Sequence, residues 1–378
     1  MKFAFCLFNY FPFGGLQRDF MRIAKACVLA GHEVHVFTGQ WEGECDPAFH
    51  LHILPTKAWT NHGRALAFAR AFKKVLKNET FDAVLGFNKM PGLDFYYAAD
   101  VCYQARVRET RPWWVRLTPR YRAWVSLERA VFDAASHTNI LLISPAQQAA
   151  YEACYHTQAN RFHCLPPGIT KDRIPTEGAV SLREQMRSVN SIPKDHFVLL
   201  MVASSFKTKG LDRAIASFAA LPNALRARAH LWVVGQDDPQ PYQKQAMALG
   251  VHSRLRFFGG RHDVPRFLLA ADGLVHPAYH ENTGTVLLEA MVAGLPVITV
   301  AACGYAHYIT ESQAGVVVPA PFNQLVWNEA LIQFLRALPT SEWRANARAY
   351  SQSADLYSMP ERVLEKLQAY KPKLLSTM

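Results

Sequence analysis

The residues whose types and spacing best suit chemistry in this sequence are two glutamates, Glu281 and Glu289. Glu281 follows the strand-like apolar run 274–277, and Glu289 falls on a short predicted helix that begins near Thr283 and ends at Gly294. A helix start offers unpaired backbone N–H groups and a positive dipole end, which together favour phosphate. Carboxylates on either side of such an anion site could hold a ligand of the sugar–diphosphate–ribose kind. The alternative is a capped core helix that carries two ordinary surface glutamates.

Positive charge for a diphosphate could come from a second loop. Residues 204–210 follow the apolar run 197–203 and place Lys207 and Lys209 just before a predicted helix, and Arg173 lies farther upstream. The loop lacks the glycine and Lys-Ser/Thr order of a Walker A motif, so a solvated loop with lysines is the alternative. The chain contains no Asp-x-Asp pair, which argues against a metal held between two carboxylates to bind diphosphate.

A third loop carries Gly14 and Gly15, directly after the first predicted strand at residues 3–8. Glycines let the backbone approach a ligand closely, and a helix follows over residues 19–29. The spacing is not Gly-x-Gly-x-x-Gly, and no acidic residue follows the second strand at residues 34–38, so dinucleotide binding is not indicated. Neither Gly-x-Ser-x-Gly nor His-Glu-x-x-His occurs, so hydrolases lack a motif here.

The elements that position these loops alternate between short apolar runs and helical patterns, which predicts parallel α/β sheets. Prolines and a glycine in 165–169 break regular structure and predict a linker between two such units. The expected division is 1–166, 167–350 and a C-terminal helical segment, 351–378. Two α/β units would face each other across a cleft, with ligands at the carboxyl ends of the strands. Predicted strands are 3–8, 34–38, 52–54, 83–87, 140–143, 197–203, 231–234, 255–258, 274–276, 297–300 and 316–319.

The composition fits two globular domains with an anionic partner. The chain has 378 residues, of which half are hydrophobic and 19% charged, and its net charge is +11. This length suits two cores, and the charge predicts nucleic acid, anionic lipid or a phosphorylated substrate as partner. No apolar run approaches the roughly 20 residues needed to span a bilayer, and the first strand does not have the character of a signal peptide. The seven cysteines are scattered, which indicates reduced thiols in a cytosol.

The segment Tyr103–Phe132 differs from the rest because it is strongly basic and aromatic. Its acids are only Glu109 and Glu128. Basic residues mixed with tryptophan and tyrosine suit the headgroup layer of an anionic membrane. Single-stranded nucleic acid would tolerate the same mixture, and a helical arm with solvated arginines is the structural alternative. Its arginines and the aromatic residues interleaved with them are Arg106, Arg108, Arg111, Arg116, Arg120, Arg122, Arg129, Trp113, Trp114, Tyr121 and Trp124.

The glutamate spacing, the Gly-Gly loop and the Lys-Gly helix start together resemble the retaining family 4 glycosyltransferases, which have the GT-B fold. The segments 10–24, 86–94, 165–169 and 303–308 resemble, more closely, the lipopolysaccharide core glucosyltransferases. The resemblance runs from about residue 3 to residue 360. It implies two Rossmann-like domains, with the acceptor in the first and the nucleotide sugar in the second.

The resemblance also implies roles for individual residues. Glu281 would accept hydrogen bonds from donor-sugar hydroxyls, and Glu289 from the ribose of UDP. Lys209 and Arg173 would stabilise the departing UDP. The implied catalytic residues are Glu281, Lys209, Asp19 and Asp100, and the implied donor-binding residues are Gly15, Arg173, Lys209, Arg261, Asp263, Glu281, Gly284, Thr285, Val286 and Glu289. Some members carry arginine where this chain has Thr208, and which cation replaces it stays open.

The implied reaction is metal-independent transfer of a hexose, glucose by default, from a UDP-sugar to a heptose of the lipid A–inner core. UDP-sugar is then a co-substrate, and no cofactor is expected. The enzyme would lie in the cytoplasm on the inner membrane of a Gram-negative bacterium, held through Tyr103–Phe132, without nucleic acid. A galactose-type or N-acetylated donor, an epimerase or hydrolase of the same fold, and a basic nucleic-acid-binding protein remain alternatives. The sequence does not settle the hexose, the acceptor hydroxyl or the oligomeric state.

Overall fold

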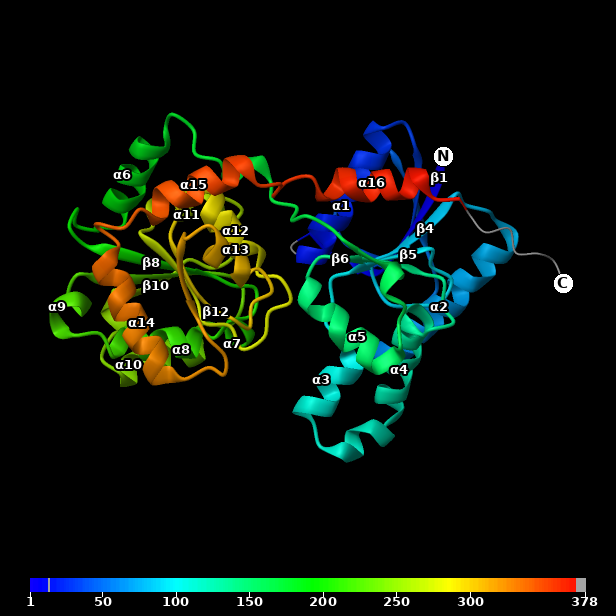
Figure 1. Cartoon of the computed structure of the whole chain (residues 1–378), viewed down its shortest axis with the longest axis horizontal. Coiled ribbons are helices and arrows are strands. Elements are labelled where there is room, and N and C mark those ends of the chain that lie inside the picture. The colour runs from blue at the N-terminus through cyan, green and yellow to red at the C-terminus, as the bar shows by residue number, and fades with distance from the viewer. Residues whose placement is uncertain (13, 372–378) are drawn as a thin grey trace. The chain divides into compact units, whose positions relative to one another are not determined.

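The computed structural model describes residues 1–12 and 14–371 (Figure 1). Phe13 of the 10–24 motif and the last seven residues of the predicted C-terminal segment lie outside the described residues. The chain forms two compact units, one comprising Met1–Gly168 and the chain from Tyr357 onward, the other Ile169–Leu356. The expected boundary at 350 was therefore wrong by several residues, because position 350 lies inside the helix α15 (Trp343–Ser353).

The first unit is built on a seven-stranded parallel sheet of order β3-β2-β1-β4-β5-β6-β7. Its strands are β1 (Lys2–Tyr10), β2 (Glu33–Trp41), β3 (Phe49–Ile53), β4 (Ala83–Gly86), β5 (Phe95–Ala98), β6 (Asn139–Leu142) and β7 (Phe162–Cys164). Its helices are α1 (Gly15–Leu29), α2 (Asn61–Asn78), α3 (Tyr103–Thr110), α4 (Pro119–Phe132), α5 (Gln148–Tyr155) and α16 (Met359–Ala369), with the 3₁₀ turns η1 (Trp113–Leu117), η2 (Pro145–Gln147) and η3 (Ala159–Arg161).

Both faces of this first sheet are buried, which explains its continuous apolar strands. On β1, Phe3 and Phe5 point into a core shared with α1 and α16, whereas Ala4 and Cys6 point into a second core shared with α2 and α4. The last helix, red in Figure 1, packs against α1, in blue, through side chains such as Val363. Helix α16 thus completes the core of the first unit, to which the chain returns after the second unit.

The second unit repeats this plan in a six-stranded parallel sheet of order β10-β9-β8-β11-β12-β13. Its strands are β8 (Phe197–Val202), β9 (Ala229–Val234), β10 (Leu255–Phe257), β11 (Gly273–His276), β12 (Val297–Val300) and β13 (Gly315–Val318). Besides α15, its helices are α6 (Ala179–Val189), α7 (Phe206–Lys209), α8 (Leu211–Ala219), α9 (Asn223–Arg226), α10 (Gln240–Ala248), α11 (Val264–Ala270), α12 (Thr285–Val292), α13 (Ala306–Glu311) and α14 (Gln324–Ala337), with the 3₁₀ turns η4 (Lys171–Arg173) and η5 (His252–Arg254).

The basic segment forms α3, η1 and α4 in the first unit. All seven of its arginines are exposed, and so are Trp113, Trp114 and Leu117 on η1. Trp124 is different, because it is partly buried against the core beneath α4. Among the described residues, no helix is long and apolar enough to cross a bilayer.

One buried carboxylate ties this basic segment together. Glu128 on α4 is fully buried and forms an ion pair with Lys89 at 2.5 Å. It also accepts hydrogen bonds from the backbone N–H groups of Tyr103 and Gln104, at 2.8 and 3.0 Å, where α3 begins. Burial alone would raise the pKa of Glu128, but Lys89 and these donors outweigh burial and lower it. The predicted acid of the segment is therefore an internal anchor, and the surface of the segment is almost purely basic.

Candidate functional site

The sheet order of the second unit places the lysine loop and the glutamate loop next to each other. β8 and β11 are neighbours at the point where the strand order reverses, and ligands of such sheets bind beyond the strand ends at this point. The turn after β8 carries Lys209, and β11 leads to Glu281. Between them Gly210 has φ +77°, and a Cβ at Gly210 would stand 2.1 Å from the carbonyl oxygen of Pro277. Only glycine allows this close approach of the two loops.

Lys209 and Glu281, separated by 72 positions in the sequence, form an ion pair in the folded chain. Both side chains are largely buried, with exposed fractions of 18% and 13%. The Glu281 loop is held from a third strand end, since Thr283 accepts a backbone hydrogen bond of 2.7 Å from Tyr305, after β12. Glu281 also forms an isolated bridge with Cys303. The Glu281 loop is thus held by contacts within the chain, as a positioning group requires.

His276 contacts the candidate site, although its position in the sequence is more typical of a structural histidine. It ends β11, is fully buried, and places Nε2 3.5 Å from Oε2 of Glu281. Burial lowers its pKa, but interactions with Cys303 and Glu281 outweigh burial and raise the pKa to about 9. Burial would likewise raise the pKa of Glu281, yet His276 and Lys209 lower it to about 2. Glu281 therefore stays ionised across the physiological range, as a hydrogen-bond acceptor for hydroxyl groups.

We expect His276→Gln to lower kcat/KM about tenfold at pH 7.5, because the Glu281 carboxylate loses an ion-pair partner and about 1.4 kcal/mol is a factor of ten. The raised folded-state pKa means that the favourable charge is fully present below pH 6.5 and is lost as pH rises through about 9. In the unchanged enzyme, kcat/KM should therefore fall near pH 9, and this fall should be missing from the His276→Gln profile. Two superimposable pH profiles would show that His276 does not act through Glu281.

Glu289 lies on α12, the helix whose start forms the anion site predicted from the sequence. It is 7% exposed on α12, and its Oε1 lies 3.4 Å from Nη2 of Arg173. Gly284 precedes the helix at φ +84°, and a Cβ there would stand 3.3 Å from Cγ of Glu281. In the described residues, no side chain caps this helix start. Its first N–H groups, at Thr285 among others, are therefore suited to an anionic ligand.

Two further positions discussed from the sequence lie in the second unit, the Arg261–Asp263 loop and the Lys207–Thr208 turn. Arg261 and Asp263 form a two-contact ion pair, with Nε–Oδ1 at 2.8 Å and Nη2–Oδ2 at 2.9 Å. This pair lies at the surface of the second unit. Hydrogen bonding to Arg261 lowers the pKa of Asp263. Lys207 and Thr208 are exposed, and Oγ1 of Thr208 accepts a 3.1 Å hydrogen bond from Ser205. Neither residue is part of the Lys209–Glu281 ion pair, in which Lys209 supplies the cation.

The first unit holds the other three residues implied by the resemblance. Gly15 begins α1, and a Cβ there would have no neighbour within 4 Å. Asp19, on the same helix, accepts a 2.8 Å hydrogen bond from the Tyr97 hydroxyl. Asp100 follows the end of β5, and its carbonyl oxygen accepts a 2.7 Å hydrogen bond from Tyr151. All three lie beyond carboxyl ends of the first sheet, where ligands of such sheets bind.

Two doubly wound parallel sheets, the second with a lysine–glutamate pair at its switch point, define a glycosyltransferase of the GT-B fold. Residues 183–353 match the family described as glycosyl transferases group 1, and residues 13–173 match glycosyltransferase family 4. The chain is 47% identical over 366 residues to the lipopolysaccharide glucosyltransferase WaaG of Escherichia coli K12, covering 97% of this chain and 98% of that protein. It belongs to the glycosyltransferase family that includes WaaG.

Solved structures agree with this assignment. A crystal structure of WaaG superposes with a TM-score of 0.91 at 46% identity, covering 97% of this chain and all of that chain. HepE of Anabaena, solved in complex with UDP-glucose, gives a TM-score of 0.73 at 20% identity, covering 98% of this chain and all of HepE. At that identity, the second similarity shows the fold alone.

Proposed function

We propose that this protein is a retaining, metal-independent glucosyltransferase that moves glucose from UDP-glucose to a heptose of the lipopolysaccharide inner core. The observation that carries the proposal is the Glu281 carboxylate, which Lys209 and His276 keep ionised beside an uncapped helix start. The full-length similarity to a lipopolysaccharide glucosyltransferase supports the sugar and the acceptor.

In the proposed reaction, the acceptor hydroxyl attacks the anomeric carbon on the face from which UDP departs. The bond from this carbon to the phosphate oxygen breaks, a bond to the acceptor oxygen forms, and the leaving phosphate takes the hydroxyl proton. Glu281 orients the sugar, and Glu289 accepts from the ribose. Lys209, Arg173 and the N–H groups of α12 stabilise the charge on the departing diphosphate. Divalent metal is not needed in this scheme, because these groups supply the positive charge.

Residues of the first unit would serve the acceptor and, in the case of Gly15, the donor phosphate. Asp19 and Asp100 are proposed to contact acceptor hydroxyls, and Gly15 to present its N–H to phosphate. In the second unit, Arg261 and Asp263 are proposed to border the uracil. These roles rest on the resemblance and on the position of each residue beyond a strand end.

We further propose that the basic segment Tyr103–Phe132 holds the enzyme on the cytoplasmic face of the inner membrane, where the acceptor lies. Its support is the composition of the exposed surface, with seven arginines against the single exposed acid Glu109. The exposed Trp113 and Trp114 give this surface the aromatic groups that settle at a headgroup layer. Nucleic acid, the alternative partner, lacks such an apolar layer.

We expect a variant with Trp113→Ser, Trp114→Ser, Arg116→Ala and Arg120→Ala to bind anionic vesicles at least about tenfold more weakly. Each arginine near an anionic surface contributes about 1 kcal/mol, and about 1.4 kcal/mol is a factor of ten. Co-sedimentation with phosphatidylglycerol vesicles at low salt measures the change. A control variant with Trp59→Ser, Arg64→Ala and Arg70→Ala removes exposed groups elsewhere in the same unit and should bind normally. Equal binding by both variants would reject the membrane role.

The test of function is a donor screen on truncated lipopolysaccharide that ends in inner-core heptose, with and without EDTA. We expect transfer from UDP-glucose, unchanged by EDTA, and an α-linked product by NMR. Transfer from UDP-galactose or an N-acetylated donor instead would replace the proposed sugar. Loss of activity in EDTA would contradict metal independence. Free sugar or an epimer released without acceptor would favour a hydrolase or an epimerase, and retention of nucleic acid without transfer would overturn the proposal.

A further inference from the structure

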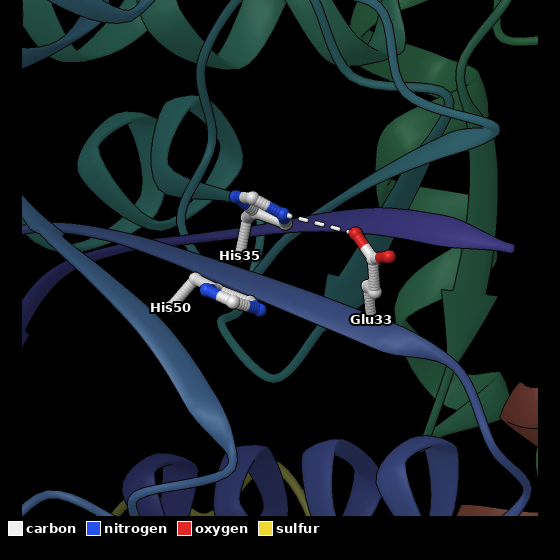
Figure 2. A group of neighbouring side chains, drawn as sticks. All are labelled: Glu33, His35 and His50. Atoms are coloured by element: carbon white, nitrogen blue, oxygen red, sulfur yellow. Dashed lines mark ion pairs between the residues drawn. The ribbon is translucent and has the colours of Figure 1, made fainter.

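We propose that Glu33, His35 and His50, at the edge of the first sheet, form a zinc-class metal site that is separate from the sugar-transfer site. Figure 2 shows the three side chains gathered on the neighbouring strands β2 and β3. One ligand atom from each lies within 4.8 Å of the others. The site would join the edge strand β3, only five residues long, to the interior of the sheet.

The strand register explains why three ligands meet here. Glu33 and His35 are two positions apart on β2, so their side chains project from the same face. His50 is the direct partner of His35 in the parallel register between β2 and β3. Two residues at i and i+2 and one cross-strand neighbour give three ligands on one face of a rigid sheet. The remaining position of a tetrahedral ion would be open to water.

The distances fit a zinc ion with small side-chain movements. Bonds of about 2.0–2.2 Å in a tetrahedron separate neighbouring ligand atoms by roughly 3.4 Å. Nε2 of His35 already lies 3.6 Å from Oε2 of Glu33, the contact drawn in Figure 2. The His50 ring lies beside that of His35, with centroids 4.6 Å apart. Because Glu33 and His50 are exposed, their side chains are free to turn toward a shared ion.

A second observation points to a ligand at this place. His35 is 8% exposed, and its Nε2 is buried without a hydrogen bond in the described part of the chain. Buried polar nitrogens normally have a partner, and a metal ion would supply one. Nδ1 of His35 lies 3.1 Å from Nε2 of His52. In metal-bound histidines, too, the nitrogen that does not bind the metal is hydrogen-bonded to a neighbouring group, which orients the ring.

The local charge also favours a cation. The nearby ammonium of Lys2 is neutralised by Glu79, with which it forms an ion pair at 2.5 Å. Glu33 then leaves a negative charge beside the imidazoles of His35 and His50. Two histidines and one carboxylate are a ligand set that binds Zn²⁺.

Zinc titration of metal-free protein against a chromogenic chelator tests the site without reference to sugar transfer. We expect one tightly bound equivalent in the unchanged protein. His50→Ala and Glu33→Gln each remove an exposed ligand, so both should fold and should weaken zinc binding by more than the roughly 10- to 100-fold cost of losing an outer-contact residue. Zinc should also raise the melting temperature of the unchanged protein but not of His50→Ala.

The matched control is His32→Ala. His32 Nδ1 lies 3.2 Å from the amino terminus, and this pair is the nearby group most able to hold zinc by chance. The control should keep the tight equivalent and the melting shift. Cobalt(II) absorption typical of four-coordinate nitrogen and oxygen ligands should appear in the unchanged protein and in His32→Ala alone. Zinc binding that is equal in His50→Ala and the unchanged protein, or lost only in His32→Ala, would overturn the proposal.

Discussion

Glu281→Gln should lower kcat/KM for transfer about a thousandfold while the protein stays folded. Glutamine keeps the shape of the side chain but removes the charge that His276 and Lys209 maintain. Moving the reacting atoms by about 1 Å costs about 10²-fold, and a site built to hydrogen-bond a substrate hydroxyl loses up to about 10⁵-fold when that contact fails. Steady-state kinetics with a fixed acceptor measures the loss.

The fold should survive the loss of the Glu281 charge because its two partners, His276 and Lys209, need not stay buried and charged without a counter-ion. His276 owes its raised pKa partly to Glu281, so without that carboxylate the imidazole loses its proton instead of staying charged and buried. Calorimetry should still detect UDP, because its proposed contacts at Glu289 and Arg173 remain. Glu329→Gln, an exposed change on α14, is the matched control and should keep full activity. Activity of Glu281→Gln within about threefold of normal would reject the assigned role, since a lost transition-state contact costs more than that.

Much of the fold could be predicted because the strands of a doubly wound sheet are buried on both faces and stand out as apolar runs. β5 and β7 were missed for a physical reason. β5 is only four residues of aromatic and small side chains, shortly after Pro91-Gly92, and β7 is three residues long. Neither is long enough to show a period, and pairing with neighbouring strands fixes both. The boundary near 350 was misplaced because α15 continues through it without a local stop signal.

The candidate site was predictable in its loops but not in its pairs. Glu281 and Lys209 each follow an apolar strand, which sequence patterns reveal. That β8 and β11 are neighbours depends on the crossover order, so the ion pair and the contact with His276 needed the structure. The basic segment shows the same limit, since the sequence could not separate the exposed Trp113 and Trp114 from the partly buried Trp124. A signal for His276 does exist: a polar residue that ends a buried strand just before a candidate site.

Lys209→Ala is expected to lower kcat about 10²- to 10³-fold, the usual cost of removing one preorganised group that stabilises developing charge. The loss should fall mainly on kcat, because the charge on the departing diphosphate is greatest in the transition state. Lys207→Ala, two positions earlier and exposed, is the matched control and should change kcat little. Single-turnover measurements at saturating UDP-glucose separate the chemical step from binding.

The double variant Glu281→Gln with Lys209→Ala shows whether the two residues act as one unit. They are in direct contact, and residues that act as a unit are strongly non-additive. The activity of the double variant should therefore be close to that of the slower single variant. Independent effects would instead multiply to a loss of roughly 10⁵- to 10⁶-fold. A fully multiplicative loss would mean that Lys209 meets the diphosphate without depending on Glu281. The ion pair would then be only the resting partner of two groups that separate when the donor binds.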